Sequence, residues 1–253
     1  SDSDHSGLAR WLSELADSPV YVHRYEIRKL TFDYDYYSER LPFFGEAGVP
    51  LKALKEILED YDPVVKPVLP RKRVEAVLGG EELAFEGGSL KIFHLPGHSG
   101  GHICLYEAES GSFLAGDLIL KHITPNPIME ADPDDLSKRL PTLTQYMESI
   151  ESLEKLSVRL ILPGHGKNIE NGAEAVARAK KHHAERLAVV LSHLKNESLT
   201  TYQVMRRLYP DIGGFQIYLG VSEVIAHIDY LFALDKITRQ NRDGVAYYRV
   251  RTE

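Results

Sequence analysis

The stretch Pro96-Gly97-His98-Ser99-Gly100-Gly101-His102 ends an apolar run in a glycine-rich turn. Three further stretches carry the same kinds of side chain, namely Asp2-Ser3-Asp4-His5, Gly116-Asp117 and Pro163-Gly164-His165-Gly166. In α/β folds, strand ends followed by such turns are where functional side chains are presented. Histidine and aspartate together form the ligand set of Zn²⁺, Mn²⁺ or Fe. The order of the four stretches therefore predicts an α/β fold with a two-metal site.

This order resembles the metallo-β-lactamase superfamily, whose first motif, His-x-His-x-Asp-His, is followed by a lone His, a bridging Asp and a last His. The matching residues are, in chain order, Asp4 and His5 at the end of the first motif, then His98, Asp117 and His165. The resemblance covers most of residues 1–170. It implies an αββα four-layer sandwich, in which strands and helices place the ligands at one edge.

The chain departs from the family pattern at its start. Asp2 fills the place of the family's second histidine, and a carboxylate there favours Mn or Fe as well as Zn. The first histidine and the opening strands of the family fold are absent from this sequence. A sheet without those strands would expose an apolar edge. We therefore expect an upstream segment in the native protein, or the same segment supplied by a separate chain.

The resemblance also implies which residues hold which cation. Asp2 and His98 would hold the first metal, and Asp117 would bridge to the second. The ligands of that second metal would be Asp4, His5 and His165. Two divalent cations, with Zn expected first and Mn or Fe as alternatives, can share a water and lower its pKa so that it attacks at neutral pH. Asp4 and Asp117 are the expected catalytic residues.

Each assignment has a simpler alternative. His98 and His165 could be ordinary turn histidines, Asp117 a solvated turn residue, and Asp4 with His5 a helix N-cap. His102 is more consistent with a structural neighbour of the site than with a ligand. Cys104 lies in an apolar run and is expected to be a small core residue.

Composition excludes several classes of function. The chain has 253 residues, a net charge of −7 and a single cysteine. A net negative charge gives no general attraction to nucleic acid or to anionic membranes. One cysteine cannot form an internal disulfide, which fits a reducing compartment, and no signal peptide or transmembrane run is visible. We therefore expect a cytoplasmic protein with a small-molecule substrate and no membrane partner.

Hydrophobic periodicity divides the chain into two domains joined by a helix. Helices are expected over residues 6–17, 51–61, 136–156 and 172–195, and strands over 20–22, 83–86, 90–95, 103–107, 112–116 and 158–162. Further on, helices at 199–208 and 221–234 precede a hairpin at 237–251, which is a winged-helix pattern. The expected domains are residues 1–170 for the metal site, 171–196 for a bridging helix and 197–253 for a small winged-helix domain.

An aromatic segment at residues 31–50 is interrupted by proline and glycine, which favours an insertion over the site rather than a regular element. Its aromatic side chains either pack in the core or line a substrate pocket. We expect Tyr36, Tyr37 and Phe44 to contact substrate, together with His122, which follows the bridging aspartate closely.

The C-terminal domain carries equal numbers of acidic and basic residues after Asn196, so it shows no strong phosphate footprint. Four arginines fall on the expected wing hairpin: Arg239, Arg242, Arg249 and Arg251. A solvated face is the favoured interpretation. The domain is then expected to shape the substrate mouth or to mediate homodimerisation.

Phe43-Phe44-Gly45 and the end of the chain resemble the glyoxalase II-like branch of the superfamily. That resemblance implies hydrolysis of a thioester, an ester or a related acyl substrate. An endoribonuclease or phosphodiesterase acting on RNA is the first alternative, because the same two-metal site suits phosphoryl transfer. A non-catalytic binding protein with a degenerate site is the second, motivated by Asp2 and by the absent first histidine.

Overall fold

The computed structural model describes residues 3–31, 38–60 and 68–252, which divide into two compact units. Unit 1 contains Ser1–Asp35, Pro63–Pro125 and Gln145–Arg178, and unit 2 contains Tyr36–Asp62, Asn126–Thr144 and Ala179–Glu253. Residues 36–62 and 126–144 thus group with the C-terminal part of the chain. The expected division at residues 170 and 196 stays a prediction.

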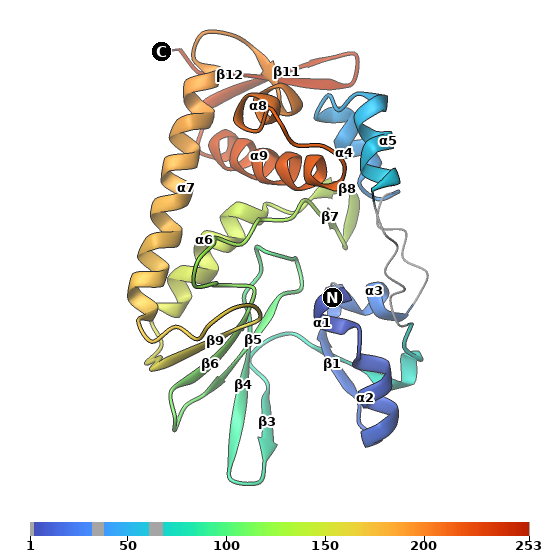
Figure 1. Cartoon of the computed structure of the whole chain (residues 1–253), viewed down its shortest axis with the longest axis vertical. Coiled ribbons are helices and arrows are strands. Elements are labelled where there is room, and N and C mark those ends of the chain that lie inside the picture. The colour runs from blue at the N-terminus through green and yellow to red at the C-terminus, as the bar shows by residue number, and fades with distance from the viewer. Residues whose placement is uncertain (1–2, 32–37, 61–67, 253) are drawn as a thin grey trace. The chain divides into compact units, whose positions relative to one another are not determined.

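Unit 1 is built on a five-stranded sheet with the order β3-β4-β5-β6-β9 (Figure 1). Its strands are β3 (Glu82–Phe85), β4 (Gly88–His94), β5 (Ile103–Glu107), β6 (Ser112–Gly116) and β9 (Leu160–Pro163). Strands β3 to β6 pair antiparallel, whereas β6 and β9 are parallel. Gly116, at the end of β6, pairs with Pro163, at the end of β9. Because parallel strands end at the same edge of a sheet, the turns after these two residues begin side by side.

A second, parallel pair of strands in unit 1 joins β1 (Val20–His23) to β2 (Val74–Val77). The accompanying helices are α1 (Ser3–Ser6), α2 (Ala9–Ala16), η1 (Arg24–Glu26), α3 (Ile27–Thr31) and η2 (Arg71–Arg73). Leu30, Leu69 and Val74 form a small buried cluster here. Among the described residues, this pair forms a sheet separate from the five-stranded one. The mixed α/β fold class is confirmed.

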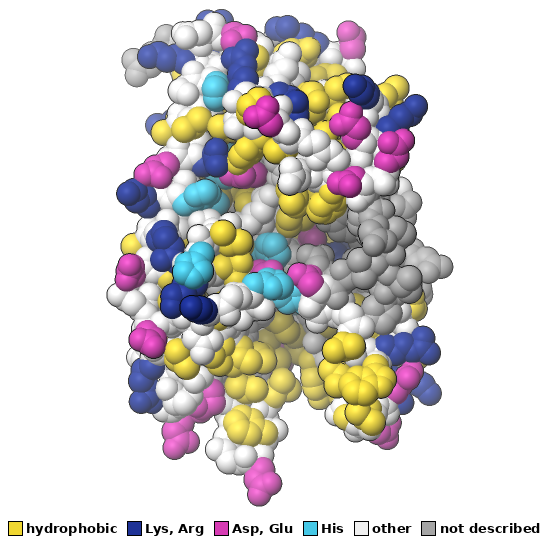
Figure 2. Space-filling model, viewed as in Figure 1, with side chains coloured by type: hydrophobic (Ala, Val, Ile, Leu, Met, Phe, Trp, Pro, Cys, Tyr) yellow, Lys and Arg dark blue, Asp and Glu magenta, His cyan; other side chains and the backbone are white. Residues whose placement is uncertain are grey.

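The apolar face of α2 lies at the protein surface. Trp11 is 58% exposed and Leu15 is 69% exposed, and Leu8 and Leu12 beside them are exposed as well. Figure 2 shows apolar side chains gathered on the surface where Figure 1 places α2. The periodicity of residues 6–17 therefore predicted a helix correctly, but that helix turns its apolar stripe toward solvent within the described part of the chain.

Unit 2 is mainly helical around one large core. Its elements are α4 (Leu41–Glu46), α5 (Leu51–Glu59), β7 (Ala131–Asp132), β8 (Asp135–Arg139), β10 (Leu199–Thr200), α8 (Thr201–Leu208), α9 (Phe215–Ala233), β11 (Ile237–Arg242) and β12 (Val245–Val250). The last three strands form a sheet with the order β10-β12-β11. This element order is compatible with the winged-helix prediction, which stays a prediction.

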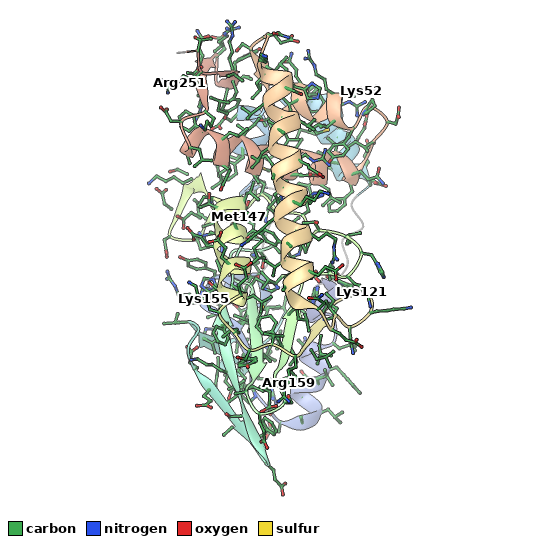
Figure 3. The ribbon with its side chains drawn as sticks, turned by 90° about the vertical axis from the view of Figure 1, so that its left-hand side faces the viewer. Lys52, Lys121, Met147, Lys155, Arg159 and Arg251 are labelled. Carbon is green, nitrogen blue, oxygen red and sulfur yellow. The ribbon has the colours of Figure 1, made fainter. Side chains whose placement is uncertain are left out.

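Two of the passages between the units lie inside helices. These helices are α6 (Thr142–Leu153) and α7 (Gly172–Leu194), and α7 is a single unbroken helix (Figure 3). The helix expected over 136–156 was wrong at its start, because residues 135–139 pair with β7 as strand β8. The segment expected to be irregular contains α4, whose phenylalanines are buried.

Helix α9 is buried on nearly every face, as expected for a helix that is apolar all round. The wing arginines are mostly engaged within the protein. Arg239 pairs with Glu46, Arg251 pairs with Asp235, and Arg242 stacks on the ring of Tyr247. These contacts favour the solvated-face interpretation of the hairpin. Among the described residues, no helix is long and apolar enough to cross a membrane.

Two buried histidines join α7 to α9. The Nδ1 atom of His183 lies 3.1 Å from Nε2 of His227, and Nδ1 of His227 lies 2.6 Å from the carbonyl oxygen of Glu223. Because a carbonyl only accepts, His227 carries its proton on Nδ1, and its Nε2 accepts from His183. Burial lowers the pKa of His183 to about 3 and that of His227 to about 4. Both side chains are therefore neutral in the folded protein at pH 7.

This pair predicts a pH-dependent loss of stability. In the unfolded chain these histidines have a pKa of about 6.5, so below this pH the unfolded chain binds protons that the folded pair does not bind. The free energy of unfolding therefore falls as the pH drops from 6.5 toward 4. The slope of the free energy of unfolding against pH is proportional to the number of protons taken up on unfolding. Replacing His227 in H227Q should lower that number by up to about one. Urea unfolding at a series of pH values measures it, with H193Q as control. An unchanged slope in H227Q would contradict the prediction.

Candidate metal centre

Four separate segments of unit 1 bring the predicted ligands to one edge of the sheet. Asp4 and His5 belong to α1, His98 to the turn between β4 and β5, Asp117 follows β6, and His165 follows β9. The edge is shared because β5 begins where β6 ends, and β9 ends beside β6. The prediction for Asp2 lies outside the described residues.

Asp117 is the meeting point of three histidines. Its Oδ2 atom lies 3.0 Å from Nε2 of His5, 3.5 Å from Nε2 of His98 and 3.7 Å from Nε2 of His165. Only 7% of Asp117 is exposed. Burial by itself raises the pKa of this carboxyl, but the hydrogen bond from His5 and the charges of the surrounding histidines outweigh it and hold the pKa below its ordinary value. The cluster therefore keeps Asp117 ionised.

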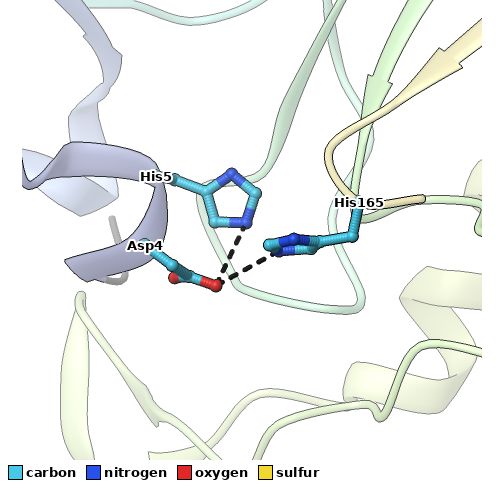
Figure 4. A group of neighbouring side chains, drawn as sticks. All are labelled: Asp4, His5 and His165. Atoms are coloured by element: carbon cyan, nitrogen blue, oxygen red, sulfur yellow. Dashed lines mark ion pairs between the residues drawn. The ribbon is translucent and has the colours of Figure 1, made fainter.

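Asp4 extends the cluster toward solvent. Its Oδ2 atom lies 3.2 Å from Nε2 of His165 and 3.8 Å from Nε2 of His5 (Figure 4). The ligand atoms of these three residues all lie within 4.8 Å of one another, close enough to hold one metal ion. All three are exposed, so a cation could enter here from solvent.

The donor set fits divalent cations. Among the described residues, Oδ1 of Asp117 is buried and has no hydrogen-bond partner. A buried carboxylate oxygen without a partner is costly, and a bound cation removes that cost. Two carboxylates and three imidazoles are ligands that Zn, Mn and Fe accept.

Gly164 makes this convergence sterically possible. A Cβ atom at this position would lie 2.8 Å from Oδ1 of Asp117 and 2.8 Å from Cε1 of His5. Its backbone N–H donates to the carbonyl oxygen of Gly116 at 2.7 Å, which ties the His165 turn to the end of β6. The glycine is therefore needed for close approach to both neighbouring candidate ligands.

A cavity of about 250 Å³ in unit 1 opens beside the cluster. Its polar lining includes His5, His98 and Asp117. Its apolar lining comes from Ala9, Val20, Val22, Leu30 and Ile103. The candidate centre is thus joined to a partly apolar space within the same unit.

Sequence reasoning missed Glu26, which also lines this cavity. Its buried Oε1 atom accepts from Nζ of Lys29 at 2.9 Å and from the backbone N–H of Gly101 at 3.1 Å. Glu26 thereby holds the turn that carries His98 from a segment 75 residues away. No local pattern in the sequence marks this contact.

His102 lies inside the sheet edge and not among the ligands. Its Nε2 atom is 3.0 Å from the backbone nitrogen of Asp117. Burial, with a smaller effect of the charge on His98, lowers the pKa of His102 to about 3. The expectation of a structural neighbour agrees with this position.

The predicted substrate contacts are dispersed. Tyr36 and Tyr37 lie outside the described residues. Phe44 is 1% exposed in the core of unit 2, where its ring packs edge-on against Tyr218. This position favours the core-packing alternative for Phe44. His122 is exposed and lines a different, polar cleft that also contains Lys121 and Arg178.

Comparison with known proteins gives one family match. Residues 1–165 match the family model described as the metallo-beta-lactamase superfamily. The chain is 29% identical over 261 residues to "Probable metallo-hydrolase YqjP" of Bacillus subtilis, covering 98% of this chain and 77% of that protein. It is also 26% identical over 134 residues to an "Atrochrysone carboxyl ACP thioesterase" of Aspergillus fumigatus, covering 52% of this chain and 38% of that protein.

Solved structures share the fold. A metallo-β-lactamase family protein from Thermus thermophilus superposes with a TM-score of 0.77 at 24% identity, covering 97% of this chain and 76% of that chain. At this identity the likeness concerns the fold alone.

Steric crowding at the centre predicts the effect of G164A. The added methyl group must displace Asp117 or His5, because it would lie 2.8 Å from both side chains. Zinc affinity, measured by competition with a chromophoric chelator, should fall by about tenfold or more. G213A is the control, since a Cβ there meets nothing within 4 Å. Equal affinities of G164A and the wild type would contradict this prediction.

Proposed function

We propose that this chain, which belongs to the metallo-β-lactamase superfamily, hydrolyses an acyl substrate of thioester or ester type with two divalent cations. The observation that carries the proposal is the buried Asp117 carboxylate, with three imidazole nitrogens within 3.7 Å of one of its oxygens and no partner on the other. Such a donor set suits divalent cations, and the relative named as a probable metallo-hydrolase supports hydrolysis as the reaction.

The residues divide naturally around Asp117. Asp4, His5 and His165 would hold one cation, His98 would contribute to the other, and Asp117 would stand between them. Bound divalent cations supply Lewis acidity and lower the pKa of water toward neutrality. The protein's own contribution is to fix these side chains before substrate arrives, because reorganisation during the reaction would raise the barrier.

Asp4 is the residue best placed to exchange protons with solvent. It is exposed, and its Oδ2 atom lies beside both His5 and His165. In the proposed reaction, Asp4 accepts the proton that the attacking water releases, and later returns it to the leaving thiolate or alkoxide. Asp117 stays ionised throughout, because the surrounding histidines stabilise its charge.

The acyl preference rests on the cavity and on one class of relatives. The apolar lining from Val20, Val22, Leu30 and Ile103 suits the hydrocarbon part of an acyl group. The Aspergillus relative is named as a thioesterase, and its match covers about half of this chain. The glyoxalase II-like assignment within the superfamily is part of this proposal.

Phosphoryl transfer is less well supported. The same ligands suit it, but α9 is buried and two of the wing arginines, Arg239 and Arg251, pair with carboxylates of unit 2, which does not favour an RNA-binding surface on the described residues. The degenerate-site alternative makes a different prediction, namely weak or single metal occupancy. Metal content and substrate screening therefore separate the three functions.

Metal dependence is the direct test. The purified protein should contain about two Zn, Mn or Fe per chain by elemental analysis. A chelator should abolish release of thiol from an acyl thioester, and added metal should restore it. D117N should lower kcat/KM by about 100-fold or more, because a ligand matters at least as much as the groups that orient it. The exposed Glu109, changed in E109Q, provides the matched carboxamide control.

Two results would contradict the proposal. Absence of bound metal after reconstitution would favour the binding role. Metal-dependent cleavage of single-stranded RNA without thioester hydrolysis would favour the nuclease.

A further inference from the structure

His102 connects the start of β5 to the end of β6. Its Nε2 atom lies 3.0 Å from the backbone nitrogen of Asp117, and its Nδ1 atom lies 3.7 Å from Sγ of Cys104. Cys104 in turn donates its S–H to the carbonyl oxygen of Ala115 at 3.3 Å. Both links therefore end on residues 115–117, the segment that delivers the central carboxylate.

The hydrogen bonds fix where the imidazole carries its proton. A backbone N–H only donates, so Nε2 of His102 is the acceptor and the proton resides on Nδ1. That Nδ1–H points to the sulfur of Cys104, which is a weak acceptor. Both ring nitrogens are thus committed within the protein, and His102 has no lone pair left for a metal.

The end of β6 is shaped to receive this ring. The pairing of β6 with β9 shifts register between Leu114 and Gly116. Gly116 has a φ of +49°, and a Cβ atom there would lie 2.8 Å from Nε2 of His102. At this irregular strand end, the next amide, that of Asp117, donates to the imidazole.

We propose that His102 is a positioning residue that sets the backbone of Asp117, and with it the direction in which the carboxylate enters the centre. The proposal rests on the metal-dependent function argued above. The side chain of Asp117 is short, because its carboxylate carbon is bonded directly to Cβ. A shift of the backbone therefore moves the carboxylate oxygens with it. His102 thereby acts on the centre through Asp117 without touching the cation.

Two variants of similar size test whether the hydrogen-bond acceptor at the place of Nε2 is required, or only a polar side chain at position 102. In H102Q the side-chain carbonyl oxygen can reach the place of Nε2, whereas H102N ends at the place of Nδ1 and leaves the Asp117 amide without its acceptor. We expect H102N to weaken zinc affinity by about 10–100-fold and H102Q to stay within a few-fold of the wild type. Thermal unfolding of the metal-free proteins reports any general loss of structure.

Three outcomes would overturn the proposal. The first is a zinc affinity of H102N equal to that of the wild type. The second is an equal loss in H102N and H102Q when their metal-free forms are equally stable. The third comes from nitrogen NMR of the metal-free wild type, where the proposal requires a proton on Nδ1 of His102 and an unprotonated Nε2. A proton on Nε2 would refute it, even if a variant failed to fold.

Failure of the proposed function would look different. A wild-type protein that binds no zinc contradicts the metal-dependent hydrolase, while the NMR measurement still decides whether His102 accepts from Asp117.

Discussion

Burial of one carboxylate, that of Asp117, is the constraint around which unit 1 is arranged. A charge with 7% exposure persists only where neighbouring groups compensate for lost hydration. The sheet topology supplies those groups, since the parallel pairing of β6 with β9 brings His165 alongside and the β4–β5 turn brings His98. Helix α1 then closes the cluster with His5, at 3.0 Å. The centre is therefore a consequence of strand order more than of any single motif.

Histidine has different roles in the two units. Histidines in unit 1 surround a carboxylate that stays charged, whereas His183 and His227 in unit 2 bond to each other as neutral rings in a core. The difference lies in the partners of the rings, because His5 bonds to the Asp117 carboxylate, whereas His183 and His227 bond to each other and burial lowers the pKa of both. Unit 2 contributes a packed scaffold around α9, and its described arginines are largely paired.

The sequence predicted what depends on local pattern. The glycine-rich turns after apolar runs pointed to His98, Asp117 and His165 as candidate metal ligands. The superfamily prediction is confirmed. The sequence could not reveal Glu26, whose partner at Gly101 is distant along the chain. Nor could periodicity tell which face of α2 is covered, because a helical stripe records apolar spacing and not the element that packs on it. Residues 135–139 form a strand through pairing with β7, which a helical interpretation of their pattern missed.

A histidine can bind a metal only through a ring nitrogen whose lone pair is not used in a hydrogen bond, and the fold determines which ring nitrogens are used in this way. His98 and His102 lie four residues apart in one turn-rich stretch, and residue type alone does not distinguish them. The structure does, because Nε2 of His98 faces the Asp117 carboxylate, whereas Nε2 of His102 accepts from the Asp117 amide. An imidazole whose acceptor nitrogen is already used cannot also bind a cation. The Asp117 amide therefore removes His102 from the candidate ligands, and this amide follows the register shift at the end of β6.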